Sequence, residues 1–223
     1  MSRYIPQRCQ QIFSNCNMVC FIDEALLCLS YFAVAFVSLN CLNIYASFVG
    51  TQSRSFAYGL FIINSIYGIG GAVSSVTSSL NHVQVIFYAA EVSFVLPFLT
   101  TEMWIQKNLF PKQQELLYVP CILGILPFFS FIMLGVIRID LIELCLVYCC
   151  VCTAYVGYIT KDYLVVAGSL LFYLAYCMHY RGKVKISNVL LILFTLCSLG
   201  SICPNCVDET RKKSDFPFKE YGF

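Results

Sequence analysis

One acidic residue, Glu91, lies several residues inside a continuous apolar stretch. An ionisable side chain in the middle of a membrane costs about 2.5–3.5 kcal/mol on insertion scales. We therefore expect Glu91 to face other helices, where it either finds a polar partner or stays protonated. Asn64, in the preceding apolar stretch, could supply a side-chain amide. The pattern fits a substrate or proton site, a hydrogen bond that locks two helices, or a position close to the membrane surface.

Two further amides, Asn40 and Asn43, lie near the end of the first apolar stretch. Their spacing places them on one face of a helix. Both could therefore hydrogen-bond to a neighbouring helix, each bond contributing about 0.6 kcal/mol in a membrane. We predict that Asn40 belongs to a buried polar site together with Glu91 and Asn64.

The sequence Cys203-Pro204-Asn205-Cys206 follows the last apolar stretch. Two cysteines at this spacing can form a redox-active disulfide or give two thiolates to zinc. Cys203 and Cys206 are thus a candidate redox or metal pair, with inert or acylated thiols as the alternative. A structural zinc site uses four ligands. No second pair of cysteines with suitable spacing lies in the polar segments, unless the N-terminal cysteines contribute. We therefore predict no bound metal.

Groups suited to enzyme chemistry are few. The two histidines, His82 and His179, lie next to turns at the ends of apolar stretches, and neither a Gly-x-Ser-x-Gly motif nor a phosphate-binding glycine loop occurs. We therefore expect a non-enzymatic scaffold or small-molecule conduit that uses no cofactor. One alternative is a membrane thiol-redox protein. Another is a truncated relative of lipid hydrolases, which would require a metal.

Seven long apolar stretches must position all of these residues. Hydrophobic residues make up 59% of the 223 residues and charged residues 12%, against about 25% charged in a typical soluble protein. About 20 apolar residues cross a bilayer as a helix, whose backbone satisfies its own hydrogen bonds. We predict an all-α polytopic transmembrane bundle of about seven spans with short loops. The expected spans are Ala25–Tyr45, Phe56–Leu80, Val83–Gln106, Leu116–Ile137, Leu141–Ile159, Tyr163–Met178 and Ile186–Cys203.

This pattern divides the chain into a polar N-terminal segment (1–24), a helical bundle (25–203) and a polar C-terminal tail (204–223). Within the second span, Gly71, Ser75 and Ser79 recur every four residues. Small residues at this spacing allow a neighbouring backbone to approach closely. We predict that these three residues form a helix-packing face.

Charge places few limits on partners. The formal net charge is +2 and no basic stripe occurs, so we expect no nucleic-acid partner. The expected partners are the lipid bilayer and other membrane proteins. Basic residues are divided almost evenly between the two membrane faces, so the positive-inside rule only slightly favours a cytoplasmic C-terminus. We expect location in the endomembrane system (Golgi or ER) or the plasma membrane.

Five short motifs follow one another along the chain between Ile63 and Gly200. They are Ile63–Ile66, Met103–Gln106 followed by Val119-Pro120, Leu141–Glu143, His179–Gly182 and Leu196–Gly200. In this order they resemble the transmembrane protein 187 family, whose members are uncharacterised multi-pass membrane proteins. The resemblance implies a helical multi-pass fold and no established reaction. The chain departs from the family in a shorter connection after the second span. It also stops near Phe223, where the family continues into an apolar segment rich in His and Asp, so we expect it to lack any chemistry of that segment.

Overall fold

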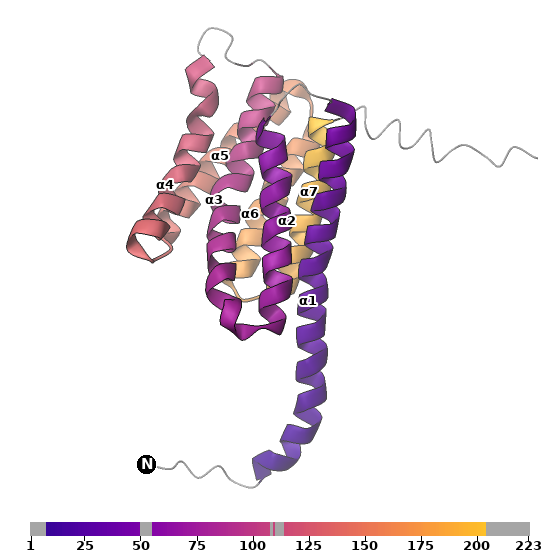
Figure 1. Ribbon diagram of the computed structural model, residues 1–223. Coiled ribbons are helices and arrows are strands. Elements are labelled where there is room, and N and C mark those ends of the chain that lie inside the picture. Colours follow the sequence, from indigo (N-terminus) through magenta and orange to yellow (C-terminus); the bar gives the residue numbers. More distant parts are fainter. Residues whose placement is uncertain (1–7, 50–54, 108, 110–113, 204–223) are drawn as a thin grey trace, which may run out of the picture.

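The computed structural model describes residues 8–49, 55–107, 109 and 114–203. In this part of the chain the regular structure is helical, with no strand (Figure 1). The long helices are α1 (Arg8–Val49), α2 (Ser55–Val76), α3 (Asn81–Gln106), α4 (Val119–Leu134), α5 (Ile139–Thr160), α6 (Tyr163–Tyr180) and α7 (Val184–Ile202). Two short 3₁₀ helices, η1 (Ser78–Leu80) and η2 (Gln114–Tyr118), precede α3 and α4.

Seven helical segments in these described residues are long and apolar enough to cross a membrane. The prediction of an all-α bundle of about seven spans is therefore confirmed, and the chain is a multi-pass membrane protein. The spans run over Ile22–Ser47, Phe56–Val76, Asn81–Gln106, Glu115–Leu134, Ile139–Thr160, Tyr163–Tyr180 and Val184–Ile202.

Consecutive helices run antiparallel, and α3 lies at the centre of the bundle (Figure 1). α1 packs on α2 and α7, whereas α3 contacts α2, α4, α5, α6 and α7. The connections from α2 to α3 and from α6 to α7 lie at the same end of the bundle, the lower end in Figure 1. We call this end the α6–α7 end. It brings the last turns of α2 and α6 close to the first turns of α3 and α7.

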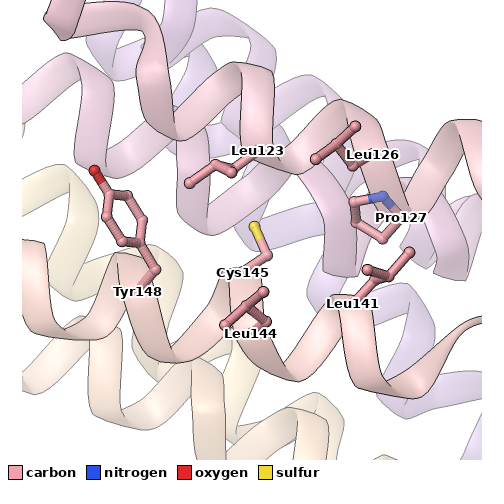
Figure 2. A pocket seen from close by; sticks show the side chains of 7 residues that line it. All are labelled: Leu123, Leu126, Pro127, Leu141, Leu144, Cys145 and Tyr148. Carbon is pink, nitrogen blue, oxygen red and sulfur yellow. The ribbon is translucent and has the colours of Figure 1, made fainter.

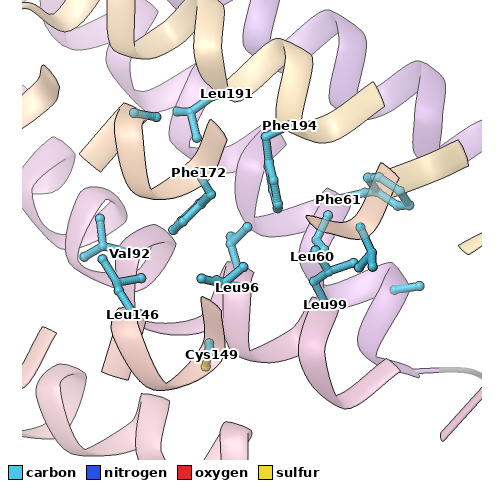
Figure 3. Close-up of a cluster of buried hydrophobic side chains, with 14 of the residues drawn as sticks. Leu60, Phe61, Val92, Leu96, Leu99, Leu146, Cys149, Phe172, Leu191 and Phe194 are labelled. Carbon is cyan, nitrogen blue, oxygen red and sulfur yellow. The ribbon is translucent and has the colours of Figure 1, made fainter. Parts of the chain in front are cut away.

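The apolar core lies between α2, α3, α5, α6 and α7 (Figure 3). Buried side chains of these five helices include Leu60, Phe61, Val92, Leu96, Leu99, Leu146, Cys149, Phe172, Leu191 and Phe194, and α1 adds Val34 and Tyr45. The outer faces are equally apolar, since Phe32 and Phe36 on α1 are about three-fifths exposed. Because lipid solvates such faces as well as the core does, close packing and polar contacts must select the inward face of each helix.

α1 and α2 approach most closely at two glycines. A Cβ atom added to Gly68 would lie 2.6 Å from the Ala35 backbone nitrogen and 2.7 Å from the Tyr31 carbonyl oxygen. A Cβ atom on Gly71 would instead meet the Tyr31 ring at 2.2 Å. The predicted packing role therefore fits Gly71, which contacts a side chain of α1. Gly68 lies directly against the α1 backbone.

The predicted small-residue face ends before its third member. Ser75 lies in the last turns of α2 and donates to the Ala72 carbonyl oxygen at 2.7 Å. Ser79 is exposed and belongs to η1, beyond the end of α2 at Val76. The prediction was therefore wrong for Ser79, because the helix that would place it on the packing face has already ended.

α4 is the most loosely attached helix and leans away from the other helices (Figure 1). Its buried residues are Pro120, Gly124 and Pro127, which share one face. Between α4 and α5 lies an apolar groove of about 250 Å³ (Figure 2). Side chains of both helices line it: Leu123, Leu126, Pro127, Leu141, Leu144, Cys145 and Tyr148.

We predict that Gly68→Ala lowers the free energy of unfolding by about 1–3 kcal/mol, because the added methyl group would overlap main-chain atoms that cannot move aside. The measurement is reversible unfolding in mixed detergent micelles. Gly168→Ala is the matched control: its Cβ atom would be 3.4 Å from the Cys197 Cβ atom, an ordinary contact. Equal effects of both substitutions would contradict the close α1–α2 contact.

Candidate functional site

Glu91 lies deep in the bundle on α3. It is the eleventh residue of that helix, about 15 Å along the helix axis from Asn81. The residue is only 2% exposed, so it faces protein and not lipid. Its carboxyl group interacts electrostatically with the side chains of Tyr31, Tyr67 and Tyr88. Among the described residues no hydrogen bond to this carboxyl group is formed, and the three phenol groups are the polar side chains near enough to interact with its charge.

Tyr67 on α2 connects the surroundings of Glu91 to two other helices. Its hydroxyl group donates to Oδ1 of Asn188 on α7 at 3.3 Å. The same hydroxyl oxygen lies 3.4 Å from Nδ1 of His179 on α6. A phenol has a single proton, so Tyr67 can donate to only one of these acceptors at a time.

Asn188 is fully buried one turn inside α7. While its oxygen accepts from Tyr67, its Nδ2 donates to Oγ of Ser30 on α1 at 2.9 Å. Ser30 in turn donates to the Leu27 carbonyl oxygen at 2.7 Å. The Asn188 amide thus holds α1, α2 and α7 in one hydrogen-bonded arrangement.

His179 stands at the last turn of α6, next to the α6–α7 connection. Its ring stacks on the Tyr88 ring with centroids 3.9 Å apart and an angle of 13° between the planes. The Tyr67 ring also packs edge-on against the Tyr31 ring, at 5.5 Å. These ring contacts fix the orientation of the side chains around Glu91.

Six side chains from five helices therefore form one polar group, which we call the Glu91 cluster. Its members are Tyr31, Tyr67, Tyr88, Glu91, His179 and Asn188. All lie in the half of the bundle nearest the α6–α7 end, since α2 and α6 end there and α3 and α7 begin there. A carboxyl group, phenols and an imidazole together can exchange protons or attract a cation.

The second predicted site residue, Asn64, is fully buried but bonds elsewhere. Its Nδ2 donates to Oγ1 of Thr195 on α7 at 3.3 Å, and no described residue donates to its Oδ1. Asn64 precedes Tyr67 by one turn of α2, so it lies further from the α6–α7 end. The structure does not join its amide to Glu91 by a hydrogen bond.

The third predicted residue, Asn40, was wrongly assigned to a buried site. It is exposed, and its Nδ2 donates to the Phe36 carbonyl oxygen of its own helix at 2.8 Å. Asn43 is also exposed. Both amides lie on the outward side of α1, where bonding to the preceding turn satisfies Asn40 without a second helix.

Of the predicted redox or metal pair, Cys203 ends α7 and is disulfide-bonded. Cys206 lies outside the described residues. Nine other described cysteines are free thiols. Within the described part of the chain, no three His, Cys, Asp or Glu side chains come together in a way that could hold a metal ion.

A second polar group lies at the opposite end of the bundle and was not predicted. Gln106 donates from Nε2 to Oε1 of Glu102 at 3.1 Å and to the Ile202 carbonyl oxygen at 3.2 Å. Nearby on α7, Ser201 donates to Oδ1 of Asp162 at 3.2 Å. The Gln106 bond to Ile202 ties the last turns of α3 and α7 together, and the Ser201 bond ties α7 to the connection between α5 and α6.

Sequence reasoning also missed most of the Glu91 cluster. One signal was present, because Tyr88 precedes Glu91 by three residues and so shares its helix face. Asn188, Tyr67 and His179 gave no such signal, since their proximity depends on how α2, α6 and α7 pack.

No family model, curated protein sequence or solved structure matches the chain. The resemblance to the transmembrane protein 187 family stays a prediction.

We predict that Asn188→Leu lowers the free energy of unfolding in detergent by about 1 kcal/mol or more, since it removes two interhelical hydrogen bonds and leaves the Tyr67 donor without that acceptor. Asn40→Leu is the matched control and should change the stability little, because Asn40 bonds only within α1. Denaturant titration followed by circular dichroism measures both. An unchanged stability of Asn188→Leu would contradict the bridging role of this amide.

Proposed function

We propose that this protein is a membrane-embedded conduit for a small positively charged species, which binds at the Glu91 cluster. The observation behind the proposal is the position of Glu91, which is 2% exposed inside a bundle of spans and surrounded by three phenols. Ionisable residues at such depth are costly, and they often mark the pathway of an ion or a proton.

The chemistry of the cluster favours a positive charge over a negative one. Tyr31, Tyr67 and Tyr88 present aromatic rings, which attract cations at their faces, and Glu91 supplies a carboxyl group. The basic side chains nearest in sequence to His179 and Asn188 are Arg181 and Lys185 in the α6–α7 connection and first turn of α7. Lys185 pairs there with Asp23 of α1, so its charge is already matched at the edge of the bundle.

A scaffold without transport is the competing function. Under that alternative, Glu91 only stabilises the packing of α3 against α1 and α2. The two alternatives differ in whether anything crosses the membrane, and flux measurements separate them.

We predict that the purified protein, reconstituted into liposomes, conducts at least one small cation faster than protein-free liposomes. The probes are protons, followed with a trapped pH dye, ⁸⁶Rb⁺ and ¹⁴C-choline. Glu91→Gln should abolish the flux, because it removes the only carboxyl group in the Glu91 cluster.

The control for this measurement is Glu115→Gln, which removes an exposed carboxyl group on η2 and should leave the flux unchanged. Size-exclusion chromatography and helix content establish that each variant is folded. Absence of flux for all three probes would overturn the conduit and favour the scaffold.

A second candidate function, membrane thiol-redox chemistry, is favoured by one observation. Cys203 is disulfide-bonded at the end of α7, at the edge of the last span. A redox-active cysteine must be accessible and must cycle between thiol and disulfide. We propose Cys203 with Cys206 as the pair that would do so.

We predict that Cys203 resists alkylation in denatured, unreduced protein and becomes alkylated after reduction, as measured by peptide mass spectrometry. Cys197, a free thiol on the same helix, is the control and should react without reduction. If Cys203 reacts as readily as Cys197 before reduction, the redox candidate is eliminated.

A further inference from the structure

We propose that the species handled by the Glu91 cluster is the proton, and that it passes between Glu91 and the α6–α7 end through Tyr67 and His179. This inference rests on the proposed function and specifies its substrate. The decisive geometry is the Tyr67 hydroxyl group, which has two alternative acceptors at nearly equal distances: Nδ1 of His179 at 3.4 Å and Oδ1 of Asn188 at 3.3 Å.

Because Tyr67 has two acceptors, its hydroxyl group has a hydrogen-bond acceptor both before and after it relays a proton. In the first arrangement Tyr67 donates to Nδ1 of His179, whose proton is on Nε2. The proton of Glu91 moves to the Tyr67 oxygen, the original Tyr67 proton moves to Nδ1, and the Nε2 proton leaves to water. In the second arrangement His179 keeps its proton on Nδ1 and donates a hydrogen bond to the Tyr67 oxygen, and the Tyr67 hydroxyl group donates its own hydrogen bond to Asn188. Glu91 has lost one proton, water has gained one, and Tyr67 and His179 are neutral.

The position of His179 supplies the exit. It is the penultimate residue of α6, and Tyr180, the next residue, is 65% exposed. Stacking on Tyr88 holds the His179 ring with Nδ1 facing Tyr67 during a transfer, which leaves Nε2 to exchange with water. A half-turn of the ring between transfers brings an unprotonated nitrogen back to Tyr67 and resets the relay for the next proton.

The first step of the relay requires a movement. Glu91 interacts electrostatically with Tyr67, but no hydrogen bond among the described residues joins them. Rotation of the Glu91 side chain, or a water molecule between the two groups, closes this gap. The absence of a fixed bond is consistent with a carboxyl group that must both accept and release a proton.

The other groups facing the relay are mostly neutral. Tyr31 from α1, Tyr67 from α2 and Tyr88 from α3 surround Glu91. Tyr176 and Cys177 of α6 lie near Tyr88, and Glu143 of α5 lies near Tyr176. From α7 the facing group is the uncharged Asn188. No basic side chain of the described residues contacts Glu91, so its proton is the movable positive charge of the cluster.

The chemistry of the relay also favours a proton over a larger cation. Three cavities in the described part of the chain do not include Glu91 in their lining: the groove between α4 and α5, the cavity lined by Asp23 and Lys185, and the cavity lined by Gly70 and Phe87. A proton needs only a sequence of donors and acceptors, whereas a metal or ammonium ion needs space for itself.

The test uses the full chain in liposomes that contain a trapped pH dye. A potassium gradient with valinomycin sets an inward driving force for protons. The wild-type protein should acidify the lumen faster than empty liposomes, and more slowly in D₂O than in H₂O. Tyr67→Phe keeps the ring but removes the hydroxyl group, and it should abolish proton flux, as should His179→Gln and Glu91→Gln. Tyr180→Phe, next to His179 but exposed, should conduct like the wild type.

Each outcome bears on a separate claim. Flux of ⁸⁶Rb⁺ or choline that depends on Glu91, without proton flux, would overturn the proton inference and leave the conduit standing. Absence of flux for every probe would overturn both. Proton flux that persists in Tyr67→Phe, or in His179→Gln, would overturn the route. The D₂O measurement on the wild type needs no variant, so misfolding of a variant does not remove the test.

Discussion

A polar side chain inside a bilayer has no water to bond with, and this constraint governs where the helices of this chain meet. Hydrophobic burial cannot align the helices, because lipid accepts the apolar faces of α1 and α4 as readily as the core does. Buried polar side chains align them instead. The amide oxygen and nitrogen of Asn188, for example, both find hydrogen-bond partners only when α1 and α2 lie beside α7. Gly68 permits this approach, since it allows the α1 backbone to lie against α2.

The existence of the spans could be predicted from sequence because it depends on composition alone. Apolar runs of about 20 residues separated by short polar breaks leave few alternatives to a helical bundle. The depth of Glu91 could be predicted for the same reason. Helix ends were less predictable, as Ser79 shows, because the uncharged stretch from Thr77 to Leu80 has no proline, glycine or charged residue to mark the turn after Val76.

The direction in which a side chain faces could not be predicted, since it depends on the rotation of each helix about its axis. Asn40 and Asn188 are the same residue type in equally apolar spans, yet one is exposed and the other fully buried. Apolar residues occur on every side of α1, and its polar residues Ser30 and Asn40 face in different directions, so its sequence contains no clear signal for which face meets α2 and α7. Asn188 is separated from Tyr67 and from Ser30 by more than 100 residues along the chain. Contacts between residues so far apart could not be predicted from a single sequence.

The polar groups at the two ends of the bundle are not joined by side-chain hydrogen bonds among the described residues. Asn64 and Thr195 bond to each other between them, and large apolar side chains pack beside this pair. Leu96 lies between Glu91 and Glu102 on α3, and Phe194 lies between Asn188 and Ser198 on α7, both fully buried. Ser198 donates to a carbonyl oxygen of its own helix, so it does not continue the side-chain network. In the described part of the chain, the side-chain hydrogen bonds of the Glu91 cluster therefore lead towards the α6–α7 end. Under the proposed conduit, a proton that crosses the whole membrane must also pass Leu96 and Phe194, where Asn64 has an amide oxygen without a donor among the described residues.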